Sequence, residues 1–235
     1  MLEVPPYIVK SGVSGQPIAY TWRPHKGVEI AEKNSSKKVE QLAQSLSLRA
    51  SLSLGIGIGE WLLWRLEAVS AYPQVFQYVD ALWARTVDAL YLKIESLDPP
   101  DDAGNPALGP LFALENLLYS VLMTATLDHP DRGKSIAQLV AVIRFTLTDP
   151  SPFDAWLRVT LERFKTNFGW DSEDPGGAFV PRAFLDPSVA IDLNRVPRLL
   201  DEQLHSIDFK GNPFLASPEE MISEGFEGTP YRYKQ

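Results

Sequence analysis

The chain contains no cysteine among its 235 residues. This absence excludes disulfide bonds, thiolate nucleophiles, zinc ribbons and iron–sulfur clusters together. The three histidines also lack the spacing of a zinc site, so we expect neither a metal nor another cofactor. A cysteine-free chain fits a reducing cytosol, and we expect a cytoplasmic protein.

Basic residues are too few to balance the acidic ones. Lys and Arg total 22 against 30 Asp and Glu, which leaves a net charge of −8 and a sequence pI near 5.0. A nucleic-acid-binding protein normally presents a basic face, and no stretch of this chain supplies one. The charge therefore argues against a nucleic-acid ligand and favours a basic protein partner.

Long apolar runs are also missing. The longest stretch without Asp, Glu, Lys or Arg has 12 residues, for example 116–127, whereas a membrane-spanning helix needs about 20 apolar residues. The first residues, Met-Leu-Glu-Val-Pro-Pro, lack the basic region and apolar stretch of a secretion signal. We therefore expect a soluble protein with no membrane span.

The chain does contain ample material for a hydrophobic core. Apolar residues make up 45% of it, and it has 6 Trp, 8 Tyr and 11 Phe. Disordered chains are poor in aromatic residues, and a chain of this length buries roughly 70% of its unfolded surface. We expect one folded domain over residues 1–235.

Apolar residues recur at helical spacing through the middle of the chain. Helix 109–127 is apolar almost all round, which is typical of a central buried helix, and Ser217 and Glu220 form a capping box for the last helix. The full set of predicted helices covers 36–70, 74–97, 109–127, 133–148, a segment from the N-cap Ser151, 196–207 and 218–224.

These patterns predict a mainly α fold, a single-domain bundle of about five to six helices. Its helical core would cover 35–168. An irregular segment, 1–34, would precede the core. An alternative for part of this segment is a hairpin of two short strands at 6–9 and 18–22. A proline-rich, aromatic-containing tail, 169–235, is expected to wrap the core.

A stripe of small residues follows every fourth position of segment 36–70: Ser47, Ser51, Gly55 and Gly59. Such a stripe allows another helix to approach closely, from the same chain or from a second copy. Because glycines lower helix stability, a break near 55–59 is plausible. The glycines also resemble a dinucleotide-binding loop, but the third glycine is misplaced and no parallel strands follow, so helix packing is favoured.

Two groups of residues have the composition of a catalytic site. Glu60, Trp64 and Glu67 would share one side of a helix, and two carboxylates near a tryptophan could form an acid–base pair in a cleft. Asp128 next to His129 could orient a general base. Core packing for the first group and an interhelical turn for the second are the favoured interpretations, so no catalytic residue is assigned.

Two acidic groups lie in predicted loops, and neither has the spacing of a calcium-binding loop. Solvated loop charge is the simpler interpretation, and binding of a basic partner is the functional one. The first group is Asp98, Asp101 and Asp102, and the second is Asp171, Glu173 and Asp174.

The stretches 49–65 and 212–231, together with the acidic helical character, give the chain a resemblance to bacterial immunity proteins that are paired with interbacterial or polymorphic toxins. The resemblance implies a non-enzymatic protein that binds a cognate toxin tightly and blocks its active site or substrate path. It assigns no site residue. Two alternatives stay open: a helical enzyme using Glu60 and Glu67 or Asp128 and His129, and a scaffold protein that self-associates, for example as a homodimer, through the small-residue stripe.

Overall fold

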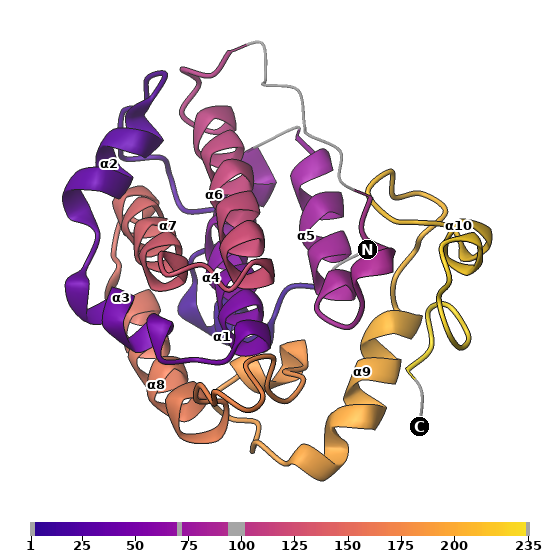
Figure 1. Ribbon diagram of the computed structural model, residues 1–235. Helices are drawn as coiled ribbons and strands as arrows, with labels where there is room; N and C mark the ends of the chain where they lie inside the picture. The colour runs from indigo at the N-terminus through magenta and orange to yellow at the C-terminus, as the bar shows by residue number, and fades with distance from the viewer. Residues whose placement is uncertain (1–2, 70–71, 94–101, 234–235) are drawn as a thin grey trace.

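The computed structural model describes residues 3–69, 72–93 and 102–233, and these residues are mainly helical, as predicted (Figure 1). They contain ten α-helices and no strand, where about five to six helices were expected. The α-helices are α1 (Pro6–Ser11), α2 (Lys26–Asn34), α3 (Lys37–Gln44), α4 (Leu48–Leu66), α5 (Gln74–Arg85), α6 (Leu108–Thr126), α7 (Arg132–Thr146), α8 (Ser151–Asn167), α9 (Val196–His205) and α10 (Pro218–Ser223). Four short 3-10 helices are η1 (Glu67–Val69), η2 (Ala89–Tyr91), η3 (Arg182–Leu185) and η4 (Leu193–Arg195).

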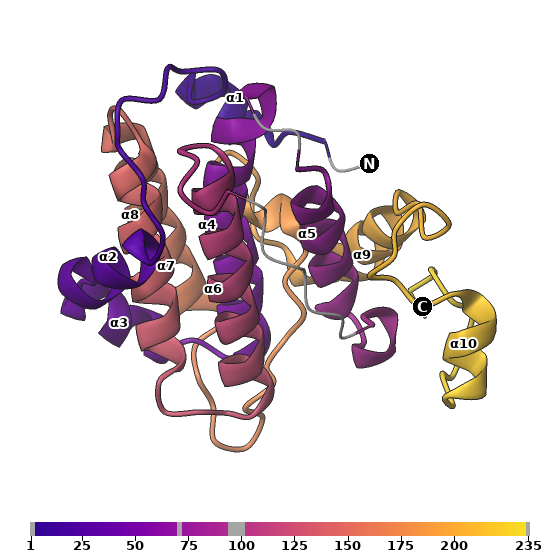
Figure 2. The same cartoon turned by 90° about the horizontal axis from the view of Figure 1, so that it is seen from above.

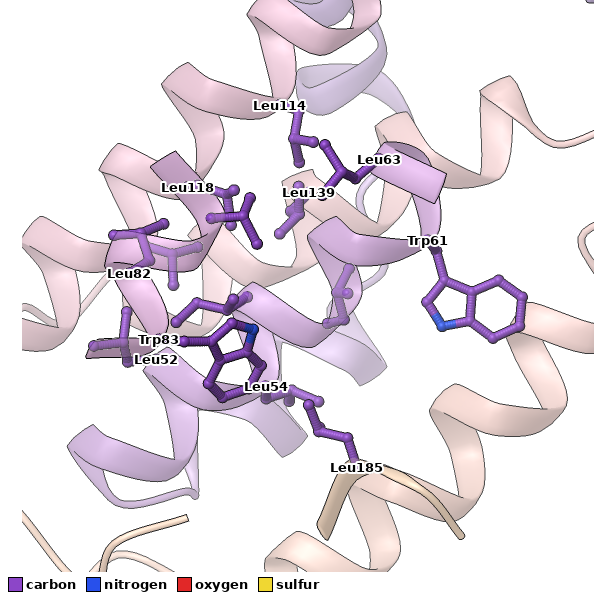
Figure 3. Packing of buried hydrophobic residues seen from close by; sticks show 14 of the residues in the cluster. Leu52, Leu54, Trp61, Leu63, Leu82, Trp83, Leu114, Leu118, Leu139 and Leu185 are labelled. Carbon is purple, nitrogen blue, oxygen red and sulfur yellow. The ribbon is translucent and has the colours of Figure 1, made fainter. Parts of the chain in front are cut away.

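Helix α4 forms the centre of the core. Every residue from Ala50 to Leu66 is buried, and α7 and α5 lie on opposite sides of α4 in both views (Figures 1 and 2). Leucines of α6 and the side chains of Leu82 and Trp83 in α5 surround it (Figure 3). A helix that is apolar on all sides requires neighbours on all sides, and α4 has them.

Helix α6 was expected to be the central buried helix, and this was wrong. It packs against α4 and α7 on one side, whereas Asn116 and Tyr119 on its other side are exposed. Among the described residues, α6 is also the one helix long and apolar enough to cross a membrane, and half of its most apolar window is buried within the protein. The length of the uncharged runs did not predict this apolar helix, because Glu115 divides its sequence into two shorter runs.

The predicted helix 36–70 is two helices, and the break lies at 45–47 instead of at the glycines. Ser36 caps α3 and Ser47 caps α4 through their side-chain oxygens. The backbone groups freed at the break bond to the loop that follows α8, because Ser47 N donates to Phe168 O and Trp170 N donates to Ser45 O. A cap and a distant loop therefore decide where the helix is interrupted.

The small-residue stripe is occupied by α6 of the same chain. A Cβ atom at Gly55 would lie 2.6 Å from Val121 Cγ1, and one at Gly59 would lie 3.1 Å from Leu114 Cδ1. The predicted role in close helix packing is thus confirmed within the chain. The same packing leaves no space for a second copy at Gly55 and Gly59.

Replacing Gly55 with alanine is expected to lower the free energy of unfolding by about 1–2 kcal/mol. The short, branched Val121 side chain has little freedom to move away, and overpacking of this kind costs about 1–3 kcal/mol, partly offset by the better helix propensity of alanine. Gly59→Ala is the matched control, because its new methyl group meets the flexible ends of two leucines and its effect should stay within about 0.5 kcal/mol. Urea unfolding of both variants tests this, and equal effects would contradict it.

The N-terminal segment differs from its prediction. Residues 6–9 lie in α1 instead of a strand, 18–22 are irregular, and no hairpin forms. Pro6 occupies the first turn of α1, where its missing N–H costs nothing, and Gly12 ends the helix in the left-handed conformation. Helix α2 was not predicted, because its N-cap, His25, makes no side-chain capping bond that the sequence would signal.

The predicted helix 74–97 ends early, at Arg85. The Thr86 hydroxyl donates to Trp83 O, and Asp88 accepts from Leu90 N to cap η2, so local side chains end α5 before its apolar pattern ends. Residues 94–97 lie outside the described part of the chain.

Helices α6 to α10 begin and end within two residues of the predicted bounds where both were given. The capping box of Ser217 and Glu220 is present. Ser151, however, is the first residue of α8 instead of its cap, and Asp149 accepts a hydrogen bond from Ser151 N.

Candidate functional site

Glu60 lies in the middle of α4 with a fully buried side chain. Its Oε1 accepts hydrogen bonds from Trp83 Nε1 at 2.6 Å and from Arg182 Nε at 2.7 Å, and its Oε2 accepts from Arg182 Nη2 at 2.8 Å. The contact joins α4 to α5 and to η3, which lies 122 residues further along the chain. Glu60 is therefore the fully buried member of a bidentate ion pair whose arginine is 23% exposed.

This pairing gives Glu60 a structural role. Both of its oxygens are engaged, and although burial disfavours the charged guanidinium, the Glu60 carboxylate holds the pKa of Arg182 above its ordinary value. The other members of the predicted cleft lie elsewhere: the Trp64 ring meets the Phe76 ring edge-on at 5.3 Å, and Glu67 is exposed in η1. The structure thus pairs Glu60 with Arg182 and not with Glu67.

A cavity of about 670 Å³ opens beside the Glu60–Arg182 pair. It lies between the segment around α1, helix α5, η3 and α9. Its volume is within the range of about 300–1,000 Å³ that is common for ligand pockets. The charged or phenolic side chains on its wall are Glu3, Tyr7, Asp80, Arg182, Asp186 and Glu202.

Asp80 contributes a half-buried carboxyl group to this wall from α5. It makes no hydrogen bond or ion pair with another described residue. Burial raises the pKa of Asp80 to about 6, because the site disfavours the charged form. A carboxyl group whose pKa is raised by burial inside a cavity is typical of a functional site.

Tyr7, in α1, also lines the cavity. Its ring stacks on Trp156 with the ring centroids 5.3 Å apart, and its buried hydroxyl has no hydrogen-bond partner among the described residues. Burial raises the pKa of Tyr7 well above its ordinary value, and the nearby Glu60 carboxylate raises it further. Buried hydroxyls normally have a partner, so an unpaired hydroxyl on a residue that lines the cavity is unusual.

Comparison with known proteins adds no relative: no family model, no curated protein and no solved structure matches this chain. The functional interpretation therefore depends on the chemistry of the cavity and of the exposed surface.

Asp128 and His129 form a turn between α6 and α7. Asp128 Oδ1 accepts from Arg132 Nη1 at 2.9 Å, whereas His129 Nδ1 accepts from Asp131 N at 3.1 Å. The aspartate thus binds an arginine and does not orient the neighbouring histidine. This geometry agrees with the interhelical turn that the sequence favoured.

Asp102 and the second predicted acidic group lie at opposite ends of α4. Helices α4 and α6 run antiparallel, because Gly55 faces Val121 and Gly59 faces Leu114, so Asp102, just before α6, lies toward the C-terminal end of α4. The second group precedes Pro175, whose carbonyl accepts from the first residue of α4. A helix of 19 residues is about 28 Å long, so Asp102 and the second group do not form one patch.

Each described acidic loop residue that makes a side-chain contact bonds to its own loop. Asp102 accepts from Gly104 N, Asp171 from Glu173 N, and Asp174 from Gly177 N. Asp98 and Asp101 lie outside the described residues. No group of three or more His, Asp or Glu in the described part of the chain could hold a metal ion.

Sequence reasoning missed Tyr7, Asp80 and Arg182. Asp80 gave one signal, because it is flanked on both sides by apolar residues in the predicted helix 74–97. Arg182 gave none, because nothing local links it to a glutamate 122 residues earlier.

Proposed function

We propose that this protein is a non-enzymatic inhibitor that binds and neutralises a cognate bacterial toxin. One observation carries the proposal: residues 217–228, the C-terminal acidic segment, hold four exposed glutamates and no basic residue. The segment includes α10 and extends away from the central helices (Figure 2). Ile222, 59% exposed, adds an apolar contact point.

Aromatic packing holds the C-terminal acidic segment in place. Within the segment, Met221 is fully buried, and the Phe226 ring meets the Tyr91 ring edge-on at 5.6 Å. Tyr91 Oη also accepts a hydrogen bond from Tyr231 N. The glutamates are therefore presented on an ordered surface, on which Glu220 pairs with Lys93 at 2.8 Å. A binding surface that is ordered in advance loses less entropy when a partner binds.

The charge of this surface supports a basic partner. Negative side chains attract and orient a positively charged protein during encounter, which raises the association rate and favours that partner over acidic ones. A toxin with a basic substrate-binding surface fits this requirement. An inhibitor of such a toxin acts where the toxin would act, which supports a cytoplasmic location.

The proposal is tested by co-expressing the protein with the toxin encoded by the neighbouring gene. We expect growth arrest to be relieved and the two proteins to purify together in a 1:1 complex. Growth arrest that persists despite soluble expression of both proteins would contradict the proposal.

The double substitution Glu219→Lys/Glu224→Lys should slow association with the toxin by about tenfold or more at low salt. The matched control is Glu67→Lys/Glu162→Lys, which changes the net charge equally at exposed positions outside the segment. Stopped-flow association rates over a salt series measure both variants. Equal slowing in the two variants would mean that overall charge, and not this segment, guides binding.

The two alternative functions receive less support. Both oxygens of Glu60 are engaged by Arg182 and Trp83, so Glu60 is not free to act as a base, and Asp128 binds Arg132 instead of orienting His129. Gly55 and Gly59 of the small-residue stripe, which would support self-association, are covered by α6.

A further inference from the structure

The cavity beside the Glu60–Arg182 pair is acidic. Its wall carries four carboxyl groups, from Glu3, Asp80, Asp186 and Glu202, and one guanidinium, from Arg182. Arg182 is already neutralised by Glu60, and it donates a further hydrogen bond to Glu3 O. Among the described residues, an anionic ligand would meet carboxylates without a free positive charge on the cavity wall, so the wall disfavours anions.

Among these carboxyl groups, Asp80 is the one best placed to bind a ligand. Glu202 forms an exposed ion pair with Arg198 at 2.6 Å, and Asp186 Oδ1 accepts from both the backbone and the hydroxyl of Ser188. Asp80 has no such partner among the described residues, although it is half-buried. A partly desolvated carboxylate without a partner attracts a cation strongly.

The buried Tyr7 hydroxyl is a second, independent indication of a ligand. It has no hydrogen-bond partner although Tyr7 is only 8% exposed and lines the cavity. A phenolic oxygen can accept a hydrogen bond from an ammonium or guanidinium group. Tyr7 and Asp80 come from different elements, α1 and α5, so their convergence on one cavity is a property of the fold.

Apolar side chains complete the walls. Val4, Leu199 and Ile207 line the same cavity, and Pro6 and Ser206 at its edge are exposed. A ligand can therefore enter from solvent and pack an aliphatic chain against the wall while its charged end reaches the carboxyl group. Lysine and arginine side chains have this combination of an apolar stem and a charged end.

We infer that this cavity binds an organic cation on an aliphatic stem, with Asp80 and Tyr7 as the groups that contact its charged end. Either a basic side chain of a protein partner or a free alkyl amine or guanidine supplies that chemistry. The inference does not depend on the proposed toxin, since the cavity is tested with the purified protein alone.

The test titrates the protein with n-butylguanidinium and n-butylammonium and follows tryptophan fluorescence and calorimetric heat. We expect both cations to bind at least tenfold more tightly than n-butanol, and butyrate not to bind. Asp80→Asn should weaken cation binding by roughly ten- to one-hundredfold, and Tyr7→Phe by a smaller factor. Glu173→Gln, an equal change of charge in an exposed loop, should leave cation binding unchanged.

A blocked Gly-Gly-Arg-Gly-Gly peptide distinguishes the two sources of the cation. Binding as tight as that of n-butylguanidinium would support the site as a receptor for a partner's side chain. Binding of the free cations alone would support a small amine or guanidine ligand. The inference is overturned if n-butanol binds as tightly as the cations, or if Asp80→Asn binds them as tightly as the unaltered protein does.

Discussion

Replacing Glu60 with alanine is expected to lower the free energy of unfolding by about 3–5 kcal/mol. Removing one partner of a buried ion pair leaves the other charge without compensation, and such changes cost about this much. Here the variant also removes the acceptor of the Trp83 indole N–H and leaves Arg182, whose side chain is only 23% exposed, without its partner. Urea denaturation followed by circular dichroism measures the effect.

Glu67→Ala is the control for this experiment. Glu67 lies seven residues further along and is exposed, so its loss should change stability by no more than about 0.5 kcal/mol. The double variant Glu60→Leu/Arg182→Met should recover much of the loss, because apolar side chains of similar volume can replace a buried ion pair. A loss below about 1 kcal/mol for Glu60→Ala would show that the ion pair contributes little to the fold.

Local signals predicted much of the helical structure. The capping box of Ser217 and Glu220 begins α10 at the expected residue, and α3, capped by Ser36, begins within one residue of the start of the predicted helix 36–70. These signals act within one turn of helix, so they are visible in a single sequence.

The errors arose where distant residues decide the outcome. Glycines inside α4 do not break it, because Val121 and Leu185 fill the space that the missing side chains leave on two faces of the helix. The interruption at 45–47 instead depends on Phe168 and Trp170, whose backbone groups pair with it. Helix propensity is a weak indicator when tertiary packing is strong.

The candidate site could not be predicted for the same reason. Glu60 was singled out as an unusual residue, and the catalytic alternative paired it with Glu67 on the same side of the helix. The structure pairs it with Arg182, and it adds Tyr7 and Asp80 from two other elements to the neighbouring cavity. Contacts over such distances depend on the whole fold and leave no periodic trace in the sequence.

Replacing Asp80 with asparagine is expected to stabilise the protein at neutral pH. The pKa of Asp80 is about 6 in the folded protein against 3.8 for an ordinary aspartate, so the folded state holds a proton more tightly than the unfolded state. Stability is therefore lost as the pH rises from about 4 through about 6, and the full cost, about 3 kcal/mol, is present above pH 7. Asparagine carries no charge and avoids this cost.

We therefore expect Asp80→Asn to raise the free energy of unfolding by about 2–3 kcal/mol at pH 7.5, which corresponds to a rise in Tm of roughly 4–12 °C. The gain should fall below about 1 kcal/mol at pH 4, where the folded protein holds Asp80 protonated. Glu173→Gln is the control, because it removes one negative charge at an exposed position. A gain that is the same at both pH values would contradict the raised pKa. A gain confined to neutral pH, together with the loss of cation binding, would mean that this carboxyl group is retained for its ligand at the expense of stability.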